Sequence, residues 1–115
     1  MISKDLAKRI ADLSLEKKAE DVRLLNLRPL TSMTDYFVLC TGATDTHVKA
    51  IADHIVDKLK SEKIRPLHIE GYARQEWVLV DYVDVVVHVF QPDKREFYSL
   101  ERLWGDAEFE EIRDE

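Results

Sequence analysis

The side chains best suited to hold a metal or to act as a nucleophile are four histidines and one cysteine. His47 and His54 stand too far apart on a predicted helix, and His68 and His88 fall on separate predicted strands. None of them makes the close i, i+4 or Cys-x-x-Cys pair that gives a metal site its specificity. Cys40 lies inside an apolar run with no neighbouring histidine to activate its thiol. The sequence therefore predicts no metal, no cofactor and no catalytic residue.

A strand-to-helix turn at residues 41–45 (TGATD) is the segment most similar to a phosphate-binding loop, because free N–H groups at a helix start can receive an anion. Its single glycine does not make a Walker loop or a dinucleotide fingerprint. Capping of the helix by Thr44 or Asp45 is the simpler interpretation. A nucleotidyltransferase-like nucleotide-binding enzyme would also need converging carboxylates for magnesium, and the acids here are scattered, so it stays an alternative.

Asp81 and Asp84 flank a predicted hairpin turn and have the chemistry of a cation-binding pair. Residues three apart in one continuous strand point to opposite faces, so only an inward-folded turn would bring both carboxylates together. Acids at a hairpin tip are more often solvated turn residues. We therefore expect both to be surface charges.

These side chains are positioned by elements that the apolar spacing predicts. Helical spacing marks residues 3–18, a helix opened by Asp45, and a last helix that starts at 91–93 and ends at Gly105. Short β-prone runs predict the strands 22–27, 36–40, 67–70, 76–82 and 84–90, the last two as an antiparallel hairpin. This order predicts one α/β domain at residues 1–105, a mixed sheet of about five strands flanked by helices, and an acidic, frayed C-terminal tail at 106–115.

Length and charge limit the possible partners. A chain of 115 residues has room for one core, and its net charge of −6 would repel nucleic acid, so we expect little direct RNA contact. The same charge would attract a basic protein.

The sequence also limits where the protein acts. No apolar run is long enough to cross a bilayer, the acids near the N-terminus argue against a transit peptide, and a lone cysteine fits a reducing compartment. The sequence thus predicts a cytoplasmic protein with no membrane partner.

The predicted hairpin carries apolar side chains on both of its faces. On its first strand, Trp77 and Asp81 share one face while Tyr82 lies on the other. Its second strand has His88 as the only polar residue within 85–90. A patch of Trp and Tyr that helices leave uncovered, rimmed by acids, would bind a protein. The alternative is that these aromatic side chains fill the core.

Several blocks, in the same order and at matching separations, resemble the RsfS/Iojap family of ribosomal silencing factors: residues 34–38 (TDYFV), 41–42 (TG), 47–48 (HV), 50–53 (AIAD), 70–71 (EG), Trp77, 81–82 (DY), 84–90 (DVVVHVF) and 95–104. The resemblance covers nearly the whole chain. It implies a fold that is a reduced form of the nucleotidyltransferase fold, and a protein that binds a partner and does not catalyse a reaction. It also implies docking on the large-subunit ribosomal protein uL14, which keeps the small subunit from joining and represses translation, and it allows a homodimer when the chain is free. A bacterial or a processed organellar origin fits equally.

Carried onto the matching positions, the resemblance implies partner-binding residues on the hairpin and the last helix: Trp77, Asp81, Tyr82, Asp84, Tyr98 and Glu101. The aromatic side chains would be anchors buried by the partner, and the acids would pair with its lysines and arginines. Trp104 is expected to face inward, because of its spacing from Leu100. The family usually has glycine at the hairpin turn where this chain has Val83, and a β-branched residue resists positive φ, so a different turn is expected.

Overall fold

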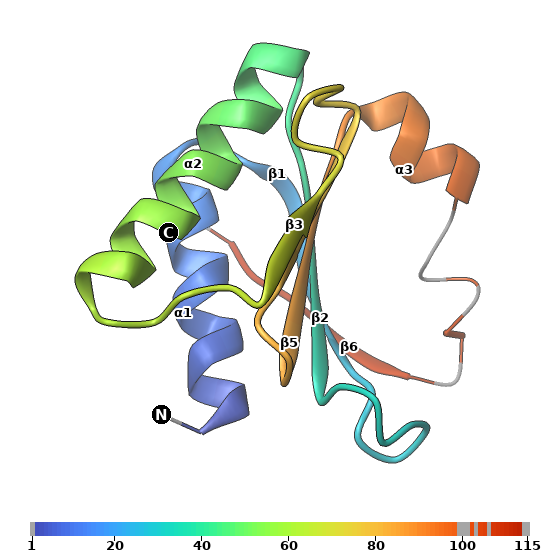
Figure 1. Cartoon of the computed structure of the whole chain (residues 1–115). Helices are drawn as coiled ribbons and strands as arrows, with labels where there is room; N and C mark the ends of the chain where they lie inside the picture. Colours follow the sequence, from blue (N-terminus) through green and yellow to red (C-terminus); the bar gives the residue numbers. More distant parts are fainter. Residues whose placement is uncertain (1, 99–101, 103, 106, 114–115) are drawn as a thin grey trace.

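The structure, a computed structural model, describes residues 2–98, 102, 104–105 and 107–113, with the main chain alone for 96–98. Its helices are α1 (Ser3–Glu16), α2 (Asp45–Ser61) and α3 (Pro92–Tyr98) (Figure 1). Its strands are β1 (Glu20–Asn26), β2 (Tyr36–Thr41), β3 (His68–Glu70), β4 (Trp77–Asp81), β5 (Val85–Phe90) and β6 (Glu108–Glu111).

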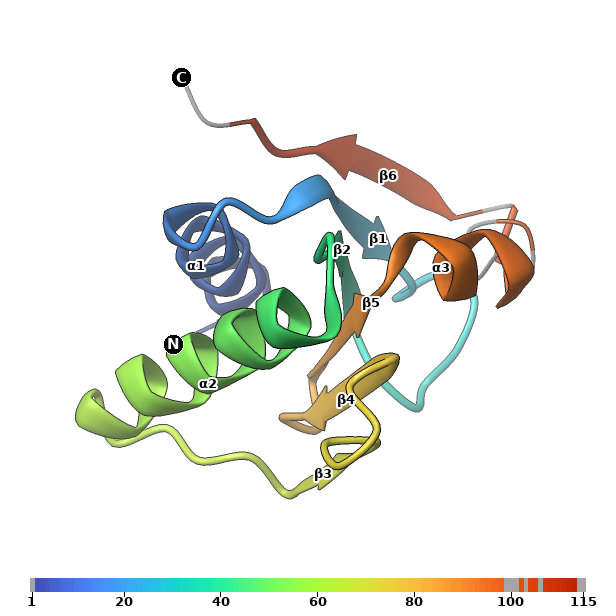
Figure 2. The ribbon, with the colours of Figure 1, turned by 90° about the horizontal axis from the view of Figure 1, so that it is seen from above.

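Within this described part, the strands form one sheet of six, in the order β3-β4-β5-β2-β1-β6. β2 and β5 run parallel, and the other neighbouring strands run antiparallel. α1 and α2 lie on one face of the sheet and α3 lies on the other (Figure 2). This arrangement confirms the predicted single α/β domain with a mixed sheet, and it adds one strand to the number expected.

The larger core lies between the sheet and the helices α1 and α2. Leu6, Ile10 and Leu13 recur at helical spacing in α1 and are buried, as are Ile51 and Ile55 in α2. These side chains meet the central strands β2 and β5, which are apolar on both faces, as is typical of strands covered from two sides. This core fixes the position of the β4–β5 hairpin, which carries the candidate site.

The C-terminal segment differs from its prediction. A frayed tail is predicted for residues 106–115, and this prediction is wrong for Glu108–Glu111, which pair antiparallel with β1. The guanidinium of Arg23 in β1 lies 5.2 Å from the centre of the Phe109 ring and 3.2 Å from a carboxylate oxygen of Glu111. Edge pairing of this kind satisfies main-chain groups without burying side chains, so no apolar periodicity reveals it.

The predicted hairpin is confirmed. β4 and β5 pair antiparallel, with Trp77 opposite Phe90 and Leu79 opposite His88. The last helix starts at Pro92, as predicted, and its predicted continuation to residue 105 runs partly through residues outside the described part. Among the residues that the structure describes, no helix is long and apolar enough to cross a membrane.

Candidate protein-binding face

Helices cover the two faces of the sheet to different extents. α1 and α2 lie along the first face and help to bury its side chains, among them Val78, Val80 and Tyr82. On the second face, α3 contacts β5, and the cluster of buried side chains among the described residues consists of Leu25, Leu27, Leu39 and Phe90 (Figure 2). The second face therefore keeps part of its apolar surface within reach of a partner.

Four apolar side chains of β2, β4 and β5 on the second face stay partly exposed, and we name the surface that they form the open face: Phe37, Trp77, Leu79 and Val86. They alternate along their strands with the buried residues of the first face. Asp81 follows them on β4, with 21% of its side chain exposed. An apolar surface beside a carboxylate suits a basic protein partner.

Trp77 is held in place within the open face. Its indole ring stacks on Phe90, with the ring centroids 5.1 Å apart, and its Nε1–H donates a hydrogen bond to Nδ1 of His88 at 3.0 Å. A side chain that is already ordered loses little conformational freedom when a partner binds. Trp77 is therefore ordered before any partner binds, and its role as a contact residue stays a prediction.

His88 lies buried beneath the open face, with 4% of the residue exposed. Burial lowers the pKa of its imidazole from 6.5 to about 3, because the charged form would lose its hydration, so the ring is neutral at physiological pH. Since Nδ1 accepts the Trp77 hydrogen, the imidazole hydrogen sits on Nε2. This donor has no hydrogen-bond partner among the described residues, and neither has the buried hydroxyl of Thr34.

A hollow of about 260 Å³ opens on this surface. We name it the apolar hollow, because much of its lining is apolar: Phe37, Leu79, Val86 and Trp104. His88 and Thr34 line it as well. Trp104 meets Phe37 edge to face, with the ring centroids 6.0 Å apart at an angle of 89°. Trp104 thus packs inward, as expected, and forms part of the wall of the hollow.

The hairpin tip places its two acids in different surroundings. Asp81 accepts a hydrogen bond from the N–H of Val83 at 2.7 Å, and its other carboxylate oxygen lies 3.7 Å from Nδ1 of His68. Asp84 is exposed, and its main-chain carbonyl accepts from the N–H of Asp35 at 2.9 Å. Within the described part of the chain, no group of three His, Cys, Asp or Glu residues could hold a metal ion. Asp84 is a surface turn residue, as predicted, while Asp81 is more enclosed.

Val83 adopts a φ of 74°, the region in which glycine is favoured and a β-branched side chain is strained. Main-chain hydrogen bonds close the turn around it, from Tyr82 N–H to the Val85 carbonyl at 2.9 Å and from Asp84 N–H to the Tyr82 carbonyl at 3.0 Å. A β-branched residue is expected to resist positive φ, and Val83 adopts it nonetheless, because the paired strands on either side impose the backbone of the turn.

The structure brings some of the predicted contact residues together and separates others. Trp77 and Asp81 share the second face, with Asp84 at the hairpin tip. Tyr82 packs into the core of the first face with 8% exposed, and burial raises the pKa of its hydroxyl to about 12. Tyr98 is described by its main chain only, and Glu101 lies outside the described residues. The two hairpin aromatics therefore do not form one patch.

His88 and Thr34 are not among the residues that the sequence predicts for the site. A lone polar residue inside the apolar β5 was the available signal for His88, since such a residue needs a partner once it is buried. No local pattern marks Thr34, because its burial depends on how the loop before β2 packs against the sheet.

Main-chain donors at the strand-to-helix turn 41–45 already make hydrogen bonds within the chain. The N–H of Ala43 donates to Nδ1 of His47 at 2.8 Å, and the N–H of His47 donates to Oγ1 of Thr44 at 3.1 Å. A Cβ added at Gly42 would lie 2.8 Å from the nitrogen of Val48, so the turn packs tightly on α2. Thr44 caps the helix, as predicted, and two of the donors that an anion would use are occupied.

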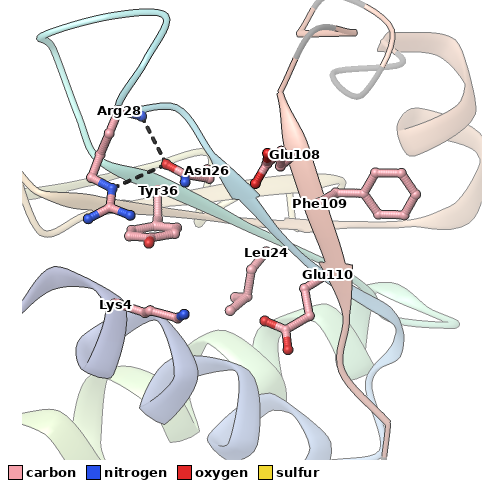
Figure 3. A pocket seen from close by; sticks show the side chains of 8 residues that line it. All are labelled: Lys4, Leu24, Asn26, Arg28, Tyr36, Glu108, Phe109 and Glu110. Atoms are coloured by element: carbon pink, nitrogen blue, oxygen red, sulfur yellow. Dashed lines mark hydrogen bonds between the residues drawn. The ribbon is translucent and has the colours of Figure 1, made fainter.

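A second hollow, between α1, β1 and β6, carries charges of both signs (Figure 3). Its lining includes Lys4 and Arg28 together with Glu108 and Glu110. Arg28 already has a partner, since its Nε lies 3.3 Å from Oδ1 of Asn26. Opposite charges in one small space favour neither an anion nor a cation. This hollow is therefore a weaker candidate site than the apolar hollow.

These features define a small α/β protein with a partly exposed apolar face beside a carboxylate. The sequence profile of the family described as "RsfS: Ribosomal silencing factor during starvation" matches residues 2–115. The chain belongs to this family of ribosomal silencing factors. The membership confirms the resemblance seen in the sequence, and a silencing factor is not an enzyme.

Similar proteins come from bacteria and from mitochondria. The ribosomal silencing factor RsfS of Bacillus subtilis is 43% identical over 107 residues, which cover 93% of this chain and 91% of that protein. The "Mitochondrial assembly of ribosomal large subunit protein 1" of Mus musculus is 31% identical over 105 residues, which cover 89% of this chain but 46% of that longer protein. A crystal structure of a Chromobacterium violaceum protein, 36% identical, matches with a TM-score of 0.88 over 91% of this chain and 88% of its own.

Proposed function

We propose that this chain binds the large ribosomal subunit through ribosomal protein uL14, keeps the small subunit from joining, and so represses translation in the cytoplasm. The observation that carries the proposal is the open face, where apolar side chains stay partly exposed beside Asp81. The names of the family and of its relatives support a ribosomal partner. Steric occlusion of the subunit interface requires a bound protein and no chemistry.

The charge of the chain supports a protein contact over an RNA contact. A net charge of −6 repels the phosphates of ribosomal RNA. The same field attracts a basic ribosomal protein and speeds the encounter. We therefore assign the main contact to a basic protein surface, with little direct contact to RNA.

The hairpin supplies the central contacts of this proposal. Trp77 lies in the open face, and Asp81 and Asp84 would pair with lysines and arginines of the partner. Tyr98 and Glu101 are assigned to the same interface because the family resemblance implies it. Tyr82 supports the hairpin tip without facing the partner, because its ring packs in the first-face core beneath the tip.

Free copies of the chain would use the same surface to form a homodimer. An apolar surface that is partly exposed in the free protein favours self-association when its partner is absent. The dimer and the ribosomal complex then compete for the open face. Adding large subunits to the dimer should release one chain per subunit, measured by analytical ultracentrifugation, and a dimer that stays intact on the subunit would contradict this part of the proposal.

Co-sedimentation with purified large subunits, together with light scattering of subunit joining, tests the function. The wild-type chain should bind the large subunit and lower the yield of joined ribosomes. Asp84→Lys reverses a charge at the hairpin tip and should weaken binding about tenfold. Asp12→Lys makes the same change on the exposed side of α1, on the other face of the sheet, and should have little effect. Absence of wild-type binding, or equal loss in both variants, would contradict the proposal.

A further inference from the structure

Two residues that line the apolar hollow each carry a buried polar atom without a hydrogen-bond partner. Nε2 of His88 and Oγ1 of Thr34 are shielded from solvent and unpaired among the described residues, and both residues line the hollow. Buried polar atoms are nearly always paired, because hydrogen bonds to water that are lost on burial must be replaced. Two unpaired atoms in one hollow therefore point to a ligand group that supplies the missing partners.

Trp77 determines which hydrogen His88 carries. Because Nε1–H of Trp77 donates to Nδ1 of the imidazole, the neutral ring must carry its hydrogen on Nε2. The imidazole thus offers a hydrogen-bond donor, which requires an oxygen acceptor on the ligand. Asp81 also lines the hollow, and its negative charge disfavours a second carboxylate. The acceptor that fits is an uncharged carbonyl oxygen.

We propose that the apolar hollow receives an apolar side chain of the partner protein, and that a carbonyl oxygen beside that side chain accepts a hydrogen bond from Nε2 of His88. The hydroxyl of Thr34, which both donates and accepts, bonds a further polar group of the same segment. Trp77 is then a positioning residue that acts through His88, and not an anchor that enters the partner. This inference rests on the proposed function, and it reverses the direction of insertion expected from the sequence.

The size and the charge of the hollow fit such a segment. Its 260 Å³ is several times the share of about 30 Å³ that one water molecule occupies in the liquid. Solvent does not reach the two unpaired atoms, so lining side chains shift when the segment enters. Met33, unbranched and 85% exposed, is the lining residue best able to move. Asp81 at the lining selects an apolar residue that has a lysine or arginine beside it.

Filling the hollow tests the proposal directly. Val86→Phe adds a ring to the lining of the apolar hollow. Val56→Phe makes the same change in a hollow of about 290 Å³ between α2 and β3, away from the open face, and is the matched control. In a co-sedimentation titration with purified large subunits, Val86→Phe should bind about tenfold more weakly, and Val56→Phe should stay within about twofold of wild type.

Removing single polar groups tests the hydrogen bonds. Thr34→Val deletes the hydroxyl with little change of shape, and Trp77→Phe keeps a ring but deletes the N–H. Each should weaken binding about fivefold to tenfold. Nitrogen NMR of the free protein should show the Nε2–H tautomer of His88 in wild type and a mixture of tautomers in Trp77→Phe. A purely structural role for Trp77 would leave the tautomer unchanged.

The outcomes separate this inference from the proposed function. If wild type binds large subunits but Val86→Phe binds as tightly as Val56→Phe, the inference is wrong and the function stands. An Nδ1–H tautomer in the free wild-type protein also overturns it. Should Val86→Phe fail to fold, unchanged binding by Thr34→Val is the overturning result. A wild-type chain that does not bind large subunits refutes the proposed function and the inference with it.

Discussion

Replacing Val83 by glycine should stabilise the protein. Val83 holds a φ of 74° and is 54% exposed, and it belongs to neither buried cluster. A non-glycine residue in this region costs about 1–3 kcal/mol, with a β-branched side chain toward the upper end. Glycine removes that strain but loses about 0.5–1 kcal/mol through its greater freedom in the unfolded chain. The expected net gain for Val83→Gly is therefore about 1 kcal/mol.

Urea unfolding followed by circular dichroism measures this gain. The midpoint should rise with an unchanged slope, and the melting temperature should rise by about 4 °C for a domain of this size. Asp84→Gly is the matched control, because Asp84 lies in the same turn without a positive φ and is exposed. It should lose about 0.5–1 kcal/mol. A Val83→Gly midpoint at or below that of wild type would refute the argument that the turn is strained.

Three further predictions concern protonation, the turn at 41–45 and nucleotides. The folded pKa of His88, near 3, lies below its unfolded value of 6.5, so its share of the stability is complete above pH 6.5 and is lost as the pH falls toward 3. Between pH 7 and pH 5, the unfolding free energy of wild type, measured in urea, should fall by about 2 kcal/mol more than that of His88→Phe. An equal fall in both proteins would contradict a buried, neutral imidazole. His47→Ala removes hydrogen bonds to the N–H of Ala43 and the carbonyl of Lys17, and it should lower the unfolding free energy by about 1–3 kcal/mol in the same assay. The control His54→Ala loses one contact, to Glu16, and should lower the unfolding free energy by a smaller amount. Calorimetry with ATP or CTP and magnesium should detect no binding, since donors of the 41–45 turn are occupied; measurable heat would revive the nucleotide-binding alternative.

The sequence predicted the elements whose side chains alternate or recur with a period. Buried faces of α1 and α2, the two-sided strand β2 and the hairpin follow from such spacing, because burial selects side-chain type at each position. β6 was missed because its pairing with β1 is made by main-chain groups, which any residue type offers. Alternation also placed Trp77 and Tyr82 on opposite faces. Which face the helices would cover depends on tertiary packing, and one strand's pattern does not contain that information.

β6 also determines what the sheet offers to other copies of the chain. An uncovered strand edge is a template on which a second chain can pair, and β1, with seven residues, would be a long one. β6 occupies that edge with four exposed residues, three of them glutamates. At the opposite edge, β3 has three residues and all are exposed. The glutamates of β6, together with the shortness of both edge strands, thus oppose edge-to-edge pairing between copies of the chain.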